Sequence, residues 1–237
     1  MAGRKCDYCL VVIGSGPGIG VHVGALFASR RYSRLALIAR SEPRLAEDRA
    51  AIEAAAPGVS VKTYAADVTD LARLRAVLDQ IGRDLGTVEC LFFNAAQVRP
   101  SKLLEADEDD MVYDFKIACS SLHVTAKWAV PQLVQLSRSD PDAKPSLLIT
   151  SSLLPQQPDP DCFFALSVVK AAQRNMAESM AKVYGPQGVH VGLIVVGGVV
   201  DPSNRTLNPK HIAERTWDLF NQPWDARTFE VEILEDS

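Results

Sequence analysis

A glycine-rich turn near the start of the chain has the residue types and spacing that bind a diphosphate. It follows the β-branched apolar run Leu10–Ile13 and opens a helical stretch that reaches about Arg30. Glycine permits a positive φ and lets the backbone approach a pyrophosphate, and a helix N-terminus offers unpaired N–H groups with partial positive charge. This strand–turn–helix context predicts a dinucleotide-binding site. The residues of this predicted site are Gly14, Ser15, Gly18, Ile19 and Gly20.

The end of the second apolar run, Leu35–Ile38, indicates which dinucleotide is preferred. Ala39, Arg40 and Ser41 follow it, about twenty residues beyond the last glycine of the turn. An acidic side chain at position 39 would bind the ribose 2′-hydroxyl of NAD, which alanine cannot do, whereas arginine binds a 2′-phosphate. The sequence therefore predicts that NADP(H) is preferred over NAD(H), with Arg40 and the Ser41 hydroxyl as contacts.

Strand-length apolar runs alternate with helix-length segments along the whole chain. The further expected strands are Val59–Ala65, Val88–Phe93, Ser146–Thr150, Val189–Val196 and Thr228–Ile233. The further expected helices are Pro43–Ala56, Asp70–Leu85, Glu105–Ser137 with a break near Asp114, Phe164–Tyr184 and Pro209–Asn221. Continuous apolar strands separated by helices are typical of a parallel sheet covered on both faces. We expect an α/β fold with a Rossmann-type doubly wound parallel sheet, as one three-layer α/β/α domain over residues 1–237.

Composition excludes several classes of partner. The 237 residues include 25 Lys and Arg against 29 Asp and Glu, a net charge of −4, which gives no reason to expect nucleic acid. No apolar run approaches the roughly 20 residues of a membrane span. Five cysteines without an export signal predict reduced thiols and a cytoplasmic location. Cys6 and Cys9 form a CxxC without a second ligand pair, so no metal site is predicted.

Taken together, these motifs resemble the short-chain dehydrogenase/reductase family from about Leu10 to Ile233. The glycine turn is similar to the family's TGxxxGxG, with Ile13 at the position of the threonine. The resemblance implies an NAD(P)-binding Rossmann fold and oxidoreduction of a carbonyl/alcohol pair on a small, fairly apolar molecule. It also implies further cofactor contacts after the third, fourth and sixth strands. These are Asp67, Val68, Asn94, Ala95, Ala96, Gly198 and Val200.

The departures from the family pattern fall on the catalytic positions. Ser152 matches the family's active-site serine, and Lys170 matches its YxxxK lysine, which is both a catalytic residue and a contact of the cofactor ribose. Leu166, however, stands where the family has tyrosine, and the helix asparagine falls on Ile117, eight residues before Thr125. A tyrosine hydroxyl acidified by a nearby ammonium donates a proton to the developing alkoxide. Leucine has no such proton.

Tyr113 is the candidate replacement for this donor, because it lies one helical turn before Ile117 on the same face. Three functions stay open. The chain is an NADP-dependent reductase, a cofactor-bound pseudoenzyme that senses NADP(H), or a non-redox isomerase or cyclase that uses the Ser152 hydroxyl beside a bound cofactor.

Two further expectations concern what surrounds the cleft. In the resembled family, the helices that correspond to Glu105–Ser137 and Phe164–Tyr184 pair across a dimer interface. Both carry apolar residues on several faces here, so we expect a homodimer or homotetramer. Only residues 201–208 separate Val200 from the last helix, where the family commonly has a longer substrate lid. The cleft is therefore expected to be open or covered by a partner chain.

Overall fold

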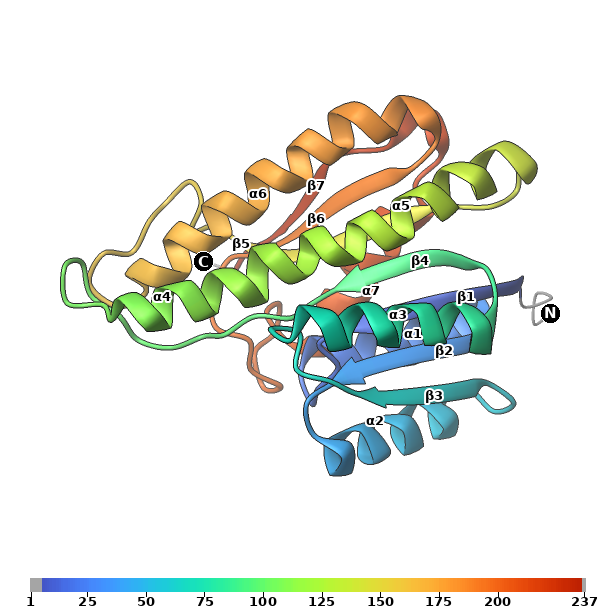
Figure 1. Cartoon of the computed structure of the whole chain (residues 1–237), viewed down its shortest axis with the longest axis horizontal. Helices are drawn as coiled ribbons and strands as arrows, with labels where there is room; N and C mark the ends of the chain where they lie inside the picture. The colour runs from blue at the N-terminus through green and yellow to red at the C-terminus, as the bar shows by residue number, and fades with distance from the viewer. Residues whose placement is uncertain (1–5, 236–237) are drawn as a thin grey trace.

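The computed structural model describes residues 6–235 and contains seven strands among its helices (Figure 1). The strands are β1 (Cys6–Ile13), β2 (Tyr32–Ala39), β3 (Ser60–Ala65), β4 (Val88–Phe93), β5 (Ser146–Ser152), β6 (His190–Val196) and β7 (Glu230–Ile233). The helices are α1 (Ile19–Arg30), α2 (Glu42–Ala55), α3 (Leu71–Leu85), α4 (Glu108–Phe115), α5 (Ser121–Ser139), α6 (Phe164–Tyr184) and α7 (Pro209–Asn221). Three short helical turns complete the list: Lys116–Ser120, Gly185–Gln187 and Trp224–Ala226.

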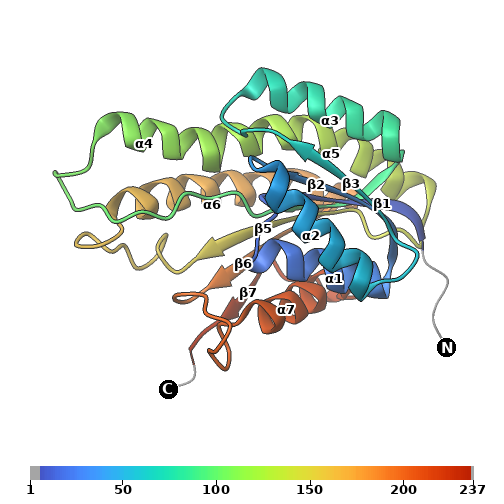
Figure 2. The ribbon, with the colours of Figure 1, turned by 90° about the horizontal axis from the view of Figure 1, so that it is seen from below.

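All seven strands pair in parallel in one sheet of order β3-β2-β1-β4-β5-β6-β7. Helices α3, α5 and α6 cover one face and α1, α2 and α7 cover the other, so the molecule has three layers (Figure 2). The strand order reverses between β1 and β4, which is the point where open parallel sheets bind ligands at the carboxyl ends of their strands. The expected doubly wound α/β fold is confirmed.

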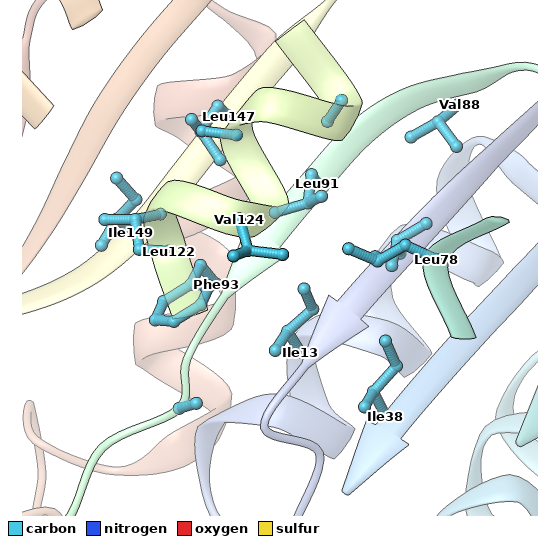
Figure 3. Close-up of a cluster of buried hydrophobic side chains, with 14 of the residues drawn as sticks. Ile13, Ile38, Leu78, Val88, Leu91, Phe93, Leu122, Val124, Leu147 and Ile149 are labelled. Carbon is cyan, nitrogen blue, oxygen red and sulfur yellow. The ribbon is translucent and has the colours of Figure 1, made fainter. Parts of the chain in front are cut away.

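The strands are apolar throughout because helices bury both of their faces. On the face beneath α3 and α5, Ile13, Phe93 and Ile149 pack against Leu78 and Leu122 (Figure 3). All five side chains are essentially inaccessible to solvent. A parallel sheet buried on both sides gives such continuous apolar runs in place of alternation, which is why the runs predicted the strands well.

The long helical region is interrupted close to the break expected near Asp114. Helix α4 ends at Phe115, and a π-helical turn at Lys116–Ser120 leads directly into α5. Asp114 itself is buried and accepts a hydrogen bond of 2.7 Å from Arg99 Nη2. Within the turn, the Ile117 carbonyl accepts a bond of 2.5 Å from Ser121 Oγ. Single π turns of this kind are frequent at functional sites.

The two cysteines of the CxxC sequence lie on β1 and point to opposite faces of the sheet. Cys9 packs in the cluster beneath α3 and α5, and Cys6 packs against the cluster on the other face. All five cysteines carry free thiols, and burial raises the pKa of Cys9 to about 12. Within residues 6–235 no group of three or more His, Cys, Asp and Glu is placed to hold a metal ion. No helix in the same range is long and apolar enough to cross a membrane.

Candidate cofactor and active site

The glycine turn lies at the carboxyl end of β1 and packs against the end of β4. Gly14 has a φ of 85°, and a Cβ placed on it would lie 2.5 Å from the backbone nitrogen of Ala95. A Cβ on Gly20 would lie 2.8 Å from the carbonyl oxygen of Gly14. A Cβ on Gly18, by contrast, would meet nothing within 4 Å. Gly14 and Gly20 are thus needed by the fold itself, whereas no neighbouring protein atom requires a glycine at position 18.

The hydrogen bonds of Ser15 differ from its expected role as a cofactor contact. Its hydroxyl donates to Asp48 Oδ2 at 2.7 Å, and its backbone N–H donates to the Ile38 carbonyl at 3.1 Å. Asp48 is fully buried and also accepts from Arg44 Nε at 2.8 Å and Nη2 at 2.6 Å. Both donors of Ser15 are therefore used inside the protein, and its role in this structure is to fix the turn on α2.

Arg40 and Ser41 come directly after β2, at the edge of the sheet where the strands have their carboxyl ends. Ser41 is the N-cap of α2, where its Oγ accepts a bond of 3.3 Å from the N–H of Arg44. Arg40 forms no ion pair with any residue between 6 and 235, in contrast to Arg44, which pairs with Glu47 and Asp48. A guanidinium without an ion-pair partner, beside the N-terminus of a helix, is a suitable place for a phosphate.

Tyr113, on α4, lies near the residues that follow β2 and β3. Its hydroxyl is 3.4 Å from Arg40 Nη1 and 3.5 Å from Asp67 Oδ2. Three strands separate β3 from β5 in the sheet, a span of about 19 Å at the usual spacing of about 4.8 Å. These contacts place the Tyr113 hydroxyl beside the predicted phosphate site and give no support to a role as proton donor at Ser152.

Asn94 connects the glycine turn to β5. Its Nδ2 donates to the Gly14 carbonyl at 2.9 Å, and its Oδ1 accepts from Thr150 Oγ1 at 2.8 Å. The carbonyl of Thr150 in turn accepts from Lys170 Nζ at 2.8 Å. The side chain of Asn94 thus holds three strand ends together. Its predicted contact with the cofactor, like those of Ala95 and Ala96, stays a prediction.

The remaining predicted cofactor contacts lie on loops with well-defined partners. Asp67 Oδ1 accepts from the N–H and the hydroxyl of Thr69, each at 2.8 Å, and Val68 is buried in the core. After β6, a Cβ on Gly198 would lie 2.7 Å from Leu207 Cδ1, so this glycine allows the loop to pack on residue 207. Val200 is half-buried beside the same cluster of apolar side chains.

The position expected for a tyrosine is filled by a packed hydrocarbon. Leu166 is 8% exposed and packs with Ala118, Cys119 and Val169. Ser152, at the end of β5, accepts a bond of 3.3 Å from the N–H of Leu154, which leaves its own O–H available to a ligand. The predicted catalytic serine therefore keeps a donor for a ligand, whereas position 166 on α6 carries no hydroxyl.

Lys170 follows Leu166 by one helical turn and is buried. Its Nζ donates to the Thr150 carbonyl at 2.8 Å and to Gln173 Oε1 at 2.9 Å. Burial without a carboxylate partner lowers the pKa of Lys170 to about 8. Gln173 was not predicted as part of the site. The signal available in the sequence was its spacing of three residues from Lys170, which places the two on one face of the helix.

The sequence profile of the family described as short chain dehydrogenase matches residues 8–211. The chain belongs to the short-chain dehydrogenase family. Among curated relatives, a short chain dehydrogenase/reductase of Aspergillus aculeatus, AacuD, is 35% identical over 111 residues, 46% of this chain and 38% of that protein. The 2-keto-3-deoxy-L-fuconate dehydrogenase of Xanthomonas campestris is 27% identical over 206 residues, 86% of this chain and 61% of that enzyme. The chain thus spans less than two thirds of the length of both relatives.

Solved structures of the same fold include short-chain dehydrogenases with bound cofactor. An NADPH-bound short-chain oxidoreductase of Pseudomonas aeruginosa, described as containing an atypical catalytic center, has a TM-score of 0.85 at 22% identity. The alignment covers 98% of this chain and 97% of that one. A metagenomic short-chain oxidoreductase in complex with NADP also has a TM-score of 0.85, at 20% identity, covering 98% of this chain and 99% of that one. These similarities establish the fold, and the match over residues 8–211 establishes the family.

Proposed function

We propose that this short-chain dehydrogenase binds NADP(H) in preference to NAD(H) and acts on the carbonyl/alcohol pair of a small molecule. The observation that carries the cofactor assignment is Arg40, a guanidinium without an ion-pair partner in residues 6–235, at the end of β2. Ala39 beside it has no carboxylate to bind a ribose 2′-hydroxyl. The open space at Gly18 accommodates the pyrophosphate.

Different groups at the carboxyl ends of the strands serve cofactor binding and substrate binding. The first N–H groups of α1, which have no partner within the helix, bind the pyrophosphate. The Lys170 ammonium retains one N–H for a ribose hydroxyl, since two are used by Thr150 and Gln173. The Ser152 hydroxyl orients a substrate oxygen. When bound, the cofactor supplies the hydride, and with Leu166 in place of tyrosine the proton for the alkoxide lacks its usual donor.

A second candidate function is cofactor binding without redox turnover. It is favoured by the packing of Leu166, which leaves no hydroxyl one turn before Lys170. A non-redox reaction assisted by Ser152 belongs to the same candidate, because it needs no proton donor at position 166. Consumption of NADPH against a panel of aldehydes and ketones distinguishes these from the reductase, which alone oxidises the cofactor.

The loops that follow β4 and β6 favour an apolar substrate. Exposed hydrocarbon side chains follow the carboxyl ends of β4 and β6: Val98 is 65% exposed, Leu104 is 94% exposed and Val199 is 78% exposed. Large apolar side chains left in solvent beside a predicted ligand site indicate contact with an apolar ligand or with a second chain. We further propose a cytoplasmic location and the absence of a nucleic-acid or membrane partner, based on the acidic net charge of −4 and the reduced thiols.

Replacing Arg40 with alanine is expected to remove most of the preference for NADP(H). The guanidinium contributes a hydrogen bond between charged groups to the 2′-phosphate, so the loss is about 1–3 kcal/mol, or roughly 5- to 150-fold in affinity. NAD(H) binding is expected to change little. Titration of both cofactors measures the preference. Arg49→Ala is the matched control, because Arg49 is paired with Glu53 on the exposed face of α2. Equal affinities of the unmodified protein for the two cofactors would refute the assignment.

The chain is expected to form a homodimer or homotetramer through α4, α5 and α6. Val112 and Phe115 on α4 and Val168 on α6 are 56%, 46% and 43% exposed. Apolar side chains exposed together on helix surfaces indicate contact with another chain. Sedimentation equilibrium at micromolar concentration is expected to give a multiple of 25.8 kDa, and Phe115→Asp is expected to shift it towards the monomer. Ala54→Asp, at an exposed position on α2 and therefore on the other face of the sheet, serves as the control. A monomer for the unmodified protein contradicts the prediction.

A further inference from the structure

Gln173, on α6, is a buried polar residue whose side-chain amide is hydrogen-bonded at both ends. Its side chain is 1% exposed, its Oε1 accepts from Lys170 Nζ at 2.9 Å, and its Nε2 donates to the Ala118 carbonyl at 2.9 Å. Both ends of the amide are thus committed. A flipped amide would place N–H groups against an ammonium and an oxygen against a carbonyl, so the contacts allow one orientation only.

The partner at the far end of this amide belongs to an irregular segment. Ala118 is in the π-helical turn Lys116–Ser120, where the carbonyl of the preceding residue, Ile117, accepts from Ser121 Oγ. Two successive carbonyls of the turn therefore receive side-chain donors. Because the turn is itself held in place, it gives Gln173 a fixed anchor on α4–α5 from which to hold a residue on α6.

The Lys170 ammonium, at the Oε1 end of the Gln173 amide, needs such a fixed partner because it is buried away from water. Lys170 is 5% exposed, and its hydrogen-bond partners, Thr150 and Gln173, are both neutral. In the part of the chain that the structure describes, the one titratable group that acts on it is the Cys119 thiol. Burial raises the pKa of Cys119 to about 11, so this thiol stays neutral where Lys170 titrates. Gln173 thus supplies one of the two acceptors that keep a charged amine in a dry site.

We propose that Gln173 is a positioning residue that orients the Lys170 ammonium for a hydrogen bond to a hydroxyl of the bound cofactor. This inference rests on the proposed function, since it takes the cofactor ribose as the acceptor of the third N–H of Lys170. The bond depends on the charged amine, which is the form that Gln173 stabilises. NADPH affinity therefore falls as the pH rises through about 8, the pKa that burial gives Lys170.

Two substitutions at this position change the charge state of Lys170 in opposite directions. Gln173→Leu removes an acceptor from the ammonium, so the pKa of Lys170 is expected to fall by about one unit, from about 8. The pH at which NADPH affinity is lost then falls by about one unit, and the affinity at pH 7 falls by about twofold, because the protonated fraction of Lys170 drops from about 0.9 to about 0.5. Gln173→Glu keeps an acceptor and adds a negative charge, so the pKa is expected to rise and the loss of affinity to occur at higher pH. A residue that only supports the fold would change affinity without moving the pH at which it is lost.

The experiment combines NADPH titration between pH 6 and 10 with the pKa of Lys170 in the cofactor-free protein, measured by NMR of ¹⁵Nζ-labelled lysine. Gln132→Leu is the matched control. Gln132 also donates to a backbone carbonyl, that of Trp128 at 2.9 Å, but it lies on α5 and is far from Lys170 in the sequence.

If Gln173→Leu does not fold, Gln173→Glu carries the test alone. An unchanged Lys170 pKa, or an unchanged pH dependence of binding, in the folded variants would overturn the inference and leave the proposed function standing. Absence of NADPH binding by the unmodified protein would overturn both, and a shifted Lys170 pKa would then leave Gln173 as a structural partner only.

Discussion

Leu166→Tyr is expected to raise NADPH-dependent reduction of simple carbonyl compounds by about 10²–10⁴-fold over the unmodified protein. The substitution places a hydroxyl one helical turn before Lys170, whose buried ammonium favours the phenolate and so acidifies the new donor. Ser152 and the glycine turn, the predicted contacts of substrate and cofactor, are unchanged in this variant. The decrease of NADPH absorbance with a panel of aldehydes and ketones measures the gain.

Leu166→Phe is the control for this experiment, because it introduces the same ring without the hydroxyl. Leu166 packs against Ala118, Cys119 and Val169, so any larger side chain strains this cluster, and thermal unfolding of both variants should report the same decrease in stability. Equal rates for the tyrosine and phenylalanine variants would show that the hydroxyl is not the missing element. Rapid turnover by the unmodified protein would show that another group already supplies the proton, and Tyr113→Phe would then test Tyr113.

Adding Ile117→Asn to Leu166→Tyr is expected to raise the rate further, and the two effects should be non-additive because the groups act as a unit. The structure places Ile117 inside the π-helical turn at 5% exposure, next to the Ala118 carbonyl that Gln173 occupies. No turnover by this double variant with NADPH demonstrably bound would favour the non-redox functions.

Gly18→Ala is expected to weaken NADPH binding by about 100-fold while leaving the free energy of unfolding nearly unchanged. A Cβ at this position meets no protein atom within 4 Å, so the new methyl group occupies only the space predicted for the pyrophosphate. Gly14→Ala gives the opposite pattern. Its Cβ would lie 2.5 Å from the Ala95 nitrogen at a φ of 85°, so the protein itself is expected to be destabilised by several kcal/mol.

Chemical denaturation and cofactor titration of the two glycine variants separate the fold from the site. If Gly18→Ala binds NADPH as tightly as the unmodified protein, the pyrophosphate does not approach this turn and the cofactor assignment fails. Gly16 provides a further comparison, because a Cβ there also meets nothing within 4 Å.

The architecture was predictable from the sequence because its signals are local. In a parallel sheet covered on both faces, each buried strand is a continuous apolar run, and β4, α6 and α7 begin and end at the predicted residues. The glycine turn was recognisable for the same reason, since glycine is required wherever the backbone adopts a positive φ or another group approaches closely, as at Gly14. The arginine at the end of β2 and the leucine at the tyrosine position are likewise properties of the sequence alone.

Only the tertiary structure decided which partners the polar side chains find. Ser15, a predicted cofactor contact, donates its hydroxyl to Asp48, a residue 33 positions away, and Tyr113, the candidate proton donor, contacts Arg40 and Asp67. Gln173 bridges Lys170 and a carbonyl 55 residues distant. A hydrogen bond between distant parts of the chain forms only where the fold brings the two groups together, so their spacing in the sequence does not predict it. The pair Lys170 and Gln173 is local and is the exception. Burial of apolar residues follows a regular pattern along each helix or strand and can therefore be recognised in the sequence. A polar contact between distant residues depends on how the elements are packed together, so it can be recognised only in the structure.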